Sequence, residues 1–275
     1  MQTGYFQTQD DAQIYYEIHG EGRPLVLLHG WQCSHRFWQR NVEALAERYQ
    51  VITPDFRGHG NSSKGIHGIT LRRYARDIHD LLAFLEVEDA VLMGWSLGGP
   101  TVLSYYDQFG ADRLKGLGLI DITPFPFSGA PWNSQGLHGH NLDGFNAQIN
   151  AMTKDREAFY NGFAANLFHK GNRPGGTEWI VEECMKLPLW ISVAIYSDYL
   201  FSDYTPVLER IKLPTLVLGA DSAVFPRGIE QGRHIASLVE DSTFVDFPDS
   251  GHILFYEEPE KFNDAVTAFM ERCFT

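Results

Sequence analysis

Residues 89–106 read DAVLMGWSLGGPTVLSYY, and this stretch decides the fold. An apolar run leads into the motif GWSLG at residues 94–98, and a segment with helical periodicity follows. A serine on a sharp turn between a strand and a helix projects its hydroxyl above the sheet, and the flanking glycines remove side chains that would clash there. We therefore expect Ser96 to be a nucleophile. The alternative, a glycine-rich helix start capped by a serine, stays open.

On both sides of this motif, short apolar runs alternate with amphipathic segments, a pattern typical of a mostly parallel sheet joined by helices. Two alternating pieces near residues 3–8 and 12–18 predict an opening hairpin at an antiparallel edge. Helices are expected over residues 70–86, with Thr70 as N-cap, and from Pro259 onwards. About eight strands are expected in all. The other apolar runs cover residues 24–30, 50–55, 114–121, 214–219 and 242–248.

Residues 122–205 break this alternation and are rich in aromatic side chains. We expect them to form a helical cap inserted after the sixth strand, which leaves residues 1–121 and 206–275 as the core domain. Core packing explains an aromatic side chain in such a segment as readily as contact with a ligand does. The side chains that we expect to contact substrate are Trp95, Phe125, Trp132 and Trp190.

The charge balance argues against nucleic acid as a partner. The 275 residues carry 22 basic and 35 acidic side chains, a net charge of −13, without a basic run that could follow a phosphate backbone. Cys33, Cys184 and Cys273 are too scattered for a disulfide framework or a metal site, so we expect a reducing cytoplasm and neither a metal nor another cofactor. No apolar segment approaches the roughly 18 residues of a membrane span. Nothing in the pattern indicates an oligomeric state.

The order of strand, GWSLG turn and helix resembles the α/β-hydrolase superfamily over almost the whole chain apart from the cap, in particular its serine esterases and cofactor-free haloperoxidase-like members. Two further stretches carry this resemblance, LLHGWQ at residues 27–32 and PDFRGHG at residues 54–60. The first is similar to the family's oxyanion turn. It implies that the backbone N–H groups of Trp31 and Leu97 stabilise the oxyanion formed when Ser96 attacks a carbonyl.

His252 is the expected general base. It follows an apolar strand and a DSGH loop and precedes the final helix, where it resembles the family's catalytic histidine. It would accept the proton of Ser96 and return it to the leaving group.

Two aspartates are candidates for the acid that orients this histidine. The family's usual pattern after the seventh strand is G-x-x-D-x-x-x-P, but here Ser222 occupies the place of the acid and Asp221 lies one residue earlier. Asp121 ends the strand next to the nucleophile strand, at the carboxyl edge where α/β sheets build their sites. Some haloalkane dehalogenases and quinolone-cleaving dioxygenases of this fold carry the acid there. We favour Asp121, with Asp221 as the alternative.

These features imply a serine hydrolase similar to carboxylesterases, which cleaves a small carboxylic ester, lactone or related acyl compound through an acyl-enzyme. The aromatic cap indicates an apolar or aromatic acyl substrate. Perhydrolase or haloperoxidase-like activity would be a side reaction of the same groups.

Two other functions stay open. HGWQCSHRFW at residues 29–38, with PDFRGHG and Asp121, is similar to cofactor-free dioxygenases that cleave quinolone rings, although those enzymes have a different sequence around the serine. A hydrolase-like receptor would keep the triad and bind a small ligand without turning it over.

Overall fold

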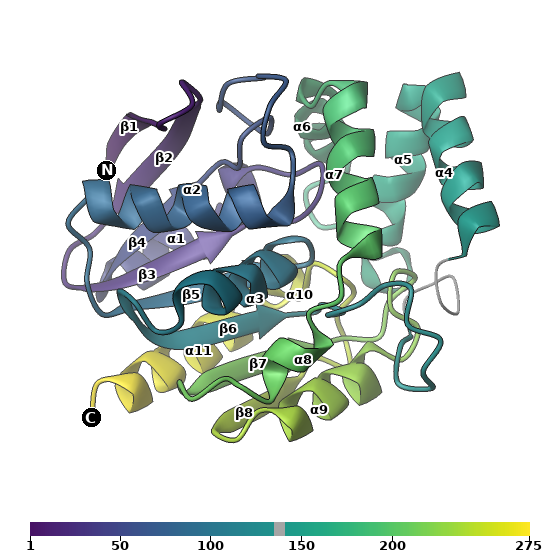
Figure 1. Ribbon diagram of the computed structural model, residues 1–275. Coiled ribbons are helices and arrows are strands. Elements are labelled where there is room, and N and C mark those ends of the chain that lie inside the picture. Colours follow the sequence, from purple (N-terminus) through teal and green to yellow (C-terminus); the bar gives the residue numbers. More distant parts are fainter. Residues whose placement is uncertain (135–140) are drawn as a thin grey trace.

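The computed structural model describes residues 1–134 and 141–275. Within them, an 8-stranded sheet has the order β1-β2-β4-β3-β5-β6-β7-β8 (Figure 1). β1 is antiparallel to β2 and β2 to β4, whereas the other neighbours are parallel, which confirms the expected sheet with its opening hairpin. The strands are β1 (Gln2–Gln7), β2 (Gln13–His19), β3 (Arg23–Leu28), β4 (Tyr49–Pro54), β5 (Ala90–Trp95), β6 (Leu114–Ile120), β7 (Thr215–Gly219) and β8 (Ser242–Asp246).

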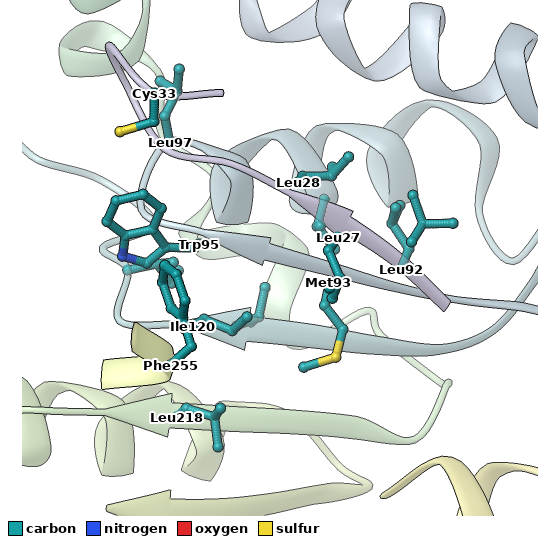
Figure 2. Close-up of a cluster of buried hydrophobic side chains, with 14 of the residues drawn as sticks. Leu27, Leu28, Cys33, Leu92, Met93, Trp95, Leu97, Ile120, Leu218 and Phe255 are labelled. Atoms are coloured by element: carbon teal, nitrogen blue, oxygen red, sulfur yellow. The ribbon is translucent and has the colours of Figure 1, made fainter. Parts of the chain in front are cut away.

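The central strands β3 and β5 are apolar because they are covered on both faces. Every residue of β5 is buried, and so are the last four residues of β3. A parallel strand between two helical layers reads as a continuous apolar run rather than as an alternation. Figure 2 shows the resulting core, in which side chains of β3 and β5 lie beside those of neighbouring elements such as Ile120, Leu218 and Phe255.

The core helices join these strands and flank the sheet, with α2 and α3 packed side by side (Figure 1). Thr70 accepts a hydrogen bond from the backbone N–H of Arg73 at 3.2 Å, so it caps α2 as expected. The last helix begins at Pro259, also as expected. These elements are η1 (His35–Trp38), α1 (Val42–Ala46), α2 (Leu71–Phe84), α3 (Gly98–Phe109), α9 (Gly228–Leu238), α10 (Leu254–Glu257) and α11 (Pro259–Cys273).

After β6 the chain leaves the sheet and returns at β7, which confirms the helical insert expected after the sixth strand. In Figure 1 its helices α4 to α7 gather at the end of the sheet where the parallel strands finish. The insert contains α4 (Leu142–Lys154), α5 (Arg156–Asn166), η2 (His169–Gly171), α6 (Glu178–Lys186), α7 (Leu189–Phe201) and α8 (Thr205–Leu208).

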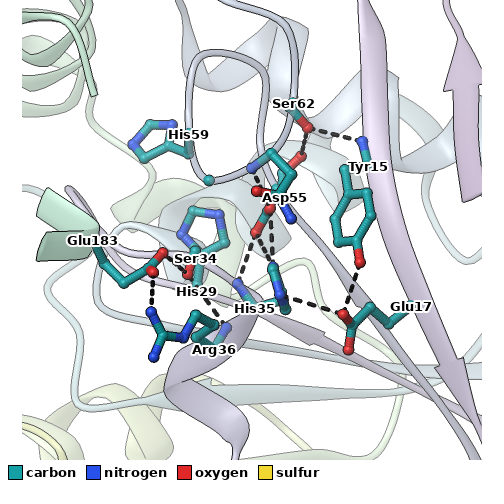
Figure 3. Close-up of polar contacts among 12 residues, drawn as sticks. Tyr15, Glu17, His29, Ser34, His35, Arg36, Asp55, His59, Ser62 and Glu183 are labelled. Atoms are coloured by element: carbon teal, nitrogen blue, oxygen red, sulfur yellow. Dashed lines mark hydrogen bonds and ion pairs between the residues drawn. The ribbon is translucent and has the colours of Figure 1, made fainter. Parts of the chain in front are cut away.

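A buried carboxylate on α6 fixes this insert to the core. Glu183 accepts hydrogen bonds from Ser34 Oγ at 2.7 Å and from Arg36 Nη1 at 2.5 Å (Figure 3), and from Lys186 Nζ at 2.6 Å. Burial by itself would raise the pKa of Glu183, but these three donors hold the pKa below its ordinary value. The anionic carboxylate therefore ties α6 to the segment that follows β3.

A second buried carboxylate, that of Asp55, organises the loop after β4. It accepts the backbone N–H groups of His35 and Asn61, both at 2.7 Å, and the ring Nδ1 of His35 lies 2.9 Å away (Figure 3). Gly60 has a φ of 44°, and a Cβ there would lie 2.1 Å from Asp55 Oδ2, so only glycine fits. The PDFRGHG signature thus builds a tight turn around a buried charge.

The thiols of Cys33, Cys184 and Cys273 are free and buried. Burial raises the pKa of the Cys33 thiol well above its ordinary value, which keeps that thiol protonated. In the parts of the chain that the structure describes, no helix combines the length and the apolar character needed to cross a membrane.

Candidate active site

Ser96 stands on a strained turn between β5 and α3. Its φ of 53° lies in the left-handed region, which costs a non-glycine residue on the order of 1 kcal/mol. Its N–H donates to the carbonyl of Ile120 at 3.1 Å, and its carbonyl accepts the N–H of Gly99 at 3.0 Å. A Cβ at Gly94 would lie 2.1 Å from the carbonyl oxygen of Gly98, so only glycine fits there. Ser96 thus occupies the type of turn that the motif predicts for a nucleophile.

A cavity of about 590 Å³ opens at this turn. Its core side includes Ser96, which directly follows β5, and His252, which lies in the loop after β8. Its cap side is formed by α4, α5 and α7. The cap residues on its wall include Gln148, Phe159, Gly162, Phe163, Tyr196 and Tyr199. The hydroxyl and the imidazole therefore face one largely apolar chamber.

Asp121 is hydrogen-bonded to the imidazole of His252. The distance from Asp121 Oδ2 to His252 Nδ1 is 2.6 Å, and both side chains are buried. Asp121 follows β6 with a φ of 46°, and its Oδ1 accepts the backbone N–H of Ala220 at 3.2 Å. Burial raises the pKa of Asp121, while the imidazole of His252 opposes that rise. With the proton on Nδ1, this contact holds the ring in the tautomer whose Nε2 is unprotonated.

The loop that carries His252 is anchored at several points. The indole Nε1 of Trp95 donates to the carbonyl oxygen of His252 at 2.8 Å. The backbone N–H of Gly251 donates to Glu257 Oε2 at 2.6 Å, and the hydroxyl of Ser250 donates to Glu258. The imidazole is therefore held by main-chain contacts as well as by Asp121.

The two residues expected to form an oxyanion hole are both on the cavity wall. Trp31 and Leu97 both line the cavity, and in the described part of the chain neither N–H has a hydrogen-bond acceptor. Leu97 directly precedes α3, where the helix dipole adds positive potential. We use the name oxyanion turn for residues 30–33, which carry Trp31.

His29 supports this turn. It is fully buried, its Nδ1 lies 2.8 Å from the carbonyl oxygen of Gly30, and its Nε2 accepts the backbone N–H of Phe56 at 3.1 Å. Burial lowers the pKa of His29 to about 4, so the ring stays neutral at physiological pH.

A profile described as the alpha/beta hydrolase family matches residues 25–265 of this sequence. The chain belongs to the alpha/beta hydrolase family. It is 28% identical to a non-heme chloroperoxidase of Kitasatospora aureofaciens, with 96% of this chain and 98% of that protein covered. It is 29% identical to a bifunctional esterase/perhydrolase of Acinetobacter calcoaceticus, with 97% and 99% covered. An esterase structure from Exiguobacterium antarcticum is similar, with a TM-score of 0.89, 25% identity, and 97% of this chain and 98% of that chain covered.

In this alpha/beta hydrolase the two candidate acids lie in different surroundings. Asp121 is buried against His252, whereas Asp221 is exposed and its Oδ1 accepts the backbone N–H of Ile229 at 3.0 Å, in the first turn of α9. Asp221 thus satisfies a backbone N–H group at the start of α9. The structure brings Ser96, His252 and Asp121 into one arrangement and leaves Asp221 outside it.

The expected substrate contacts are only partly on the cavity wall. Trp95 lines the cavity, but Phe125, Trp132 and Trp190 are not among its described lining residues. Trp132 stacks on His234 with ring centroids 5.2 Å apart, and Trp190 is 43% exposed.

Four aromatic side chains of the cap that were not among the expected contacts line the cavity: Phe159, Phe163, Tyr196 and Tyr199. Phe159 and Phe163 are four positions apart, so they share one face of α5. That spacing was visible in the sequence, but the direction of the face depends on how the cap docks. Among the described residues, no group of three or more His, Cys, Asp or Glu side chains is arranged to hold a metal ion.

Proposed function

We propose that this chain is a serine hydrolase that cleaves a small ester, lactone or related acyl compound through an acyl-enzyme. The observation that carries the proposal is the hydrogen bond between Asp121 and His252 on the wall of the cavity that also exposes Ser96. An imidazole with a fixed tautomer beside a strained serine is the arrangement that makes a hydroxyl nucleophilic.

In the acylation step, Ser96 Oγ attacks the carbonyl carbon of the substrate while Nε2 of His252 accepts its proton. The negative charge that develops on the carbonyl oxygen is stabilised by the N–H groups of Trp31 and Leu97. The carbon–oxygen bond of the ester then breaks. The departing alkoxide takes the proton from His252, and the acyl group stays on Ser96.

In the deacylation step, water enters, loses a proton to His252 and attacks the acyl carbon. The bond to Ser96 Oγ breaks, the proton returns to the serine oxygen, and the carboxylic acid leaves. Through both steps Asp121 stabilises the imidazolium that forms twice in each cycle. The apolar wall of the cavity, with Phe159, Phe163 and Tyr196, supports an apolar or aromatic substrate.

A fluorophosphonate label mapped by mass spectrometry tests the nucleophile, with Ser96→Ala as the control. We expect label on Ser96 and an initial burst of p-nitrophenol from p-nitrophenyl acetate, both lost in the variant. Label on another residue would contradict the proposal. So would oxygen consumption with a hydroxyquinolone in place of ester turnover, or ligand binding without turnover.

Perhydrolysis is a second candidate activity of the same site, because two similar proteins are named as a non-heme chloroperoxidase and a bifunctional esterase/perhydrolase. Hydrogen peroxide would replace water in deacylation, so the acyl group would leave as a peroxycarboxylic acid and Ser96 would regain its proton. That acid oxidises bromide in solution without a metal. We expect bromination of monochlorodimedone to require peroxide, acetate and an intact Ser96; bromination by Ser96→Ala would exclude this route.

A further inference from the structure

Ser192 of α7 holds the oxyanion turn from the cap. The indole Nε1 of Trp31 donates to the carbonyl oxygen of Ser192 at 3.2 Å, and the amide Nε2 of Gln32 donates to Ser192 Oγ at 2.5 Å. The hydroxyl of Ser192 donates in turn to the sulfur of Met152 at 3.3 Å. Gln32, Ser192 and Met152 are all fully buried. Two neighbouring residues of the turn thus bind to one residue of the insert.

The oxyanion turn needs such support because of its backbone. The N–H of Cys33 donates to the carbonyl of Gly30 at 3.3 Å, so these residues close a four-residue turn. Gln32 is its third residue, with a φ of 68°, where a type II turn favours glycine. A glutamine there carries strain that glycine would avoid, and its buried amide needs a partner. Ser192 Oγ accepts the hydrogen bond of Nε2, which also lies 3.5 Å from Met152 Sδ, whereas Oε1 has no hydrogen-bond partner among the described residues.

Ser192 is well placed to hold the turn, because α7 is anchored to the core on either side of it. Before it, Ile191 packs against Gly58, where a Cβ would lie 2.7 Å from Ile191 Cγ2. After it, Asp198 Oδ2 accepts the backbone N–H of Leu71 at 2.7 Å, at the start of α2. The helix therefore connects the oxyanion turn to two other parts of the core.

We propose that Ser192 is a positioning residue that keeps the N–H of Trp31 aimed at the developing oxyanion. The proposal rests on the proposed hydrolase function and concerns the same site. Ser192 acts through Trp31 and Gln32, not on the substrate. Fixed donors stabilise a transition state because they need not reorganise as charge develops, and a displacement of about 1 Å lowers the rate by up to about 10²-fold.

Ser192→Ala tests this role, and Ser197→Ala is a matched control. Ser197 lies on the same helix, and its hydroxyl donates to the carbonyl of Val193 at 2.8 Å. We expect Ser192→Ala to lower kcat for p-nitrophenyl acetate about tenfold while KM changes less than about twofold, because the lost interaction acts in the transition state. Ser197→Ala should leave both constants within about twofold. Equal effects of the two substitutions, or an effect on KM without one on kcat, would overturn the proposal.

Hydrogen–deuterium exchange tests the same contact without turnover. Backbone amides in peptides that cover the oxyanion turn should exchange several-fold faster in Ser192→Ala and at the wild-type rate in Ser197→Ala. Unchanged exchange in Ser192→Ala would also overturn the proposal. If exchange is faster in Ser192→Ala than in the wild type but the wild type hydrolyses no ester, the result would count against the hydrolase function and not against the contact.

A double-mutant cycle separates this contact from general loosening of the cap. Gln32→Met removes the amide that binds Ser192 while keeping a side chain of similar length. If the two side chains act through their shared hydrogen bond, Ser192→Ala with Gln32→Met should lower kcat no further than the larger single effect. Fully additive losses would contradict the proposed pairing.

Discussion

Asp121 Oδ2 lies 2.6 Å from Nδ1 of His252, although the two residues are 131 positions apart in the sequence. Asp121 reaches the imidazole because it immediately follows β6, next to β5, in a left-handed conformation. The family's usual acid position, after β7, holds Ser222 in this chain. The site therefore combines the strained turn at Ser96 with a carboxylate from the end of the neighbouring strand.

Asp121→Asn should lower kcat by about 10⁴ with little change in KM, as expected when a triad carboxylate no longer fixes the histidine tautomer. Asp221→Asn is the matched control, because asparagine can still accept the N–H of Ile229, and its kcat should stay within about twofold. The measurement is steady-state hydrolysis of p-nitrophenyl acetate, with circular dichroism to verify folding. A large loss in Asp221→Asn and a small one in Asp121→Asn would transfer the role of the acid to Asp221.

His35 should make the stability of the fold depend on pH near neutrality. Burial disfavours its charged form, but the hydrogen bond and charge of Asp55, with the charge of Glu17, raise its pKa above the ordinary value of 6.5 (Figure 3). A folded-state pKa above the unfolded one means that the stabilisation is complete below the unfolded pKa. It is lost as the pH rises through the folded-state pKa.

The free energy of unfolding, measured by urea titration between pH 6 and pH 8.5, tests this. Relative to His35→Gln, the wild type should lose stability as the pH rises across this range. His67 is exposed, so His67→Gln should follow the wild-type profile. If the free energy of unfolding depends on pH in the same way in the wild type and in His35→Gln, His35 is not the source of the pH dependence.

Glu183→Gln should weaken the attachment of the insert to the core. The substitution leaves Ser34 and Arg36 facing a neutral amide, and we expect unfolding to become easier by about 1–3 kcal/mol, less than for a fully buried ion pair because Arg36 and Lys186 are partly exposed. The adjacent Glu182 is exposed, so Glu182→Gln should change stability by less than about 0.5 kcal/mol. Equal midpoints for the two variants in thermal unfolding would contradict this assignment.

The strands of the sheet could be predicted from the sequence because the burial of each strand determines the composition of that same short segment. β5 is buried on both faces, so a run of apolar residues records its environment directly. Ser96 could be predicted for a similar reason. Only glycine fits at Gly94, so the turn requires a glycine two positions before the serine. Asp121 could be favoured because it stands where a strand ends.

The cap side chains that face the cavity could not be predicted in the same way. Trp132 and Phe163 are both aromatic, yet Trp132 stacks on His234 while Phe163 faces the cavity. The difference depends on how each helix docks, and local patterns do not encode docking. The contact between Gln32 and Ser192 joins residues 160 positions apart, so no local pattern could have predicted it.

Gly162 should set the length of the acyl group that the cavity accepts. It lies inside α5 on the cavity wall, and a Cβ there would meet no atom within 4 Å. Glycine in a helix interior costs about 1 kcal/mol relative to alanine, so Gly162→Ala should stabilise α5 and leave turnover nearly unchanged. Gly162→Leu should fill part of the cavity. We expect its ratio of kcat/KM for p-nitrophenyl octanoate over p-nitrophenyl acetate to fall about tenfold, the effect of a few lost methylene contacts. An unchanged ratio would mean that the acyl chain binds elsewhere.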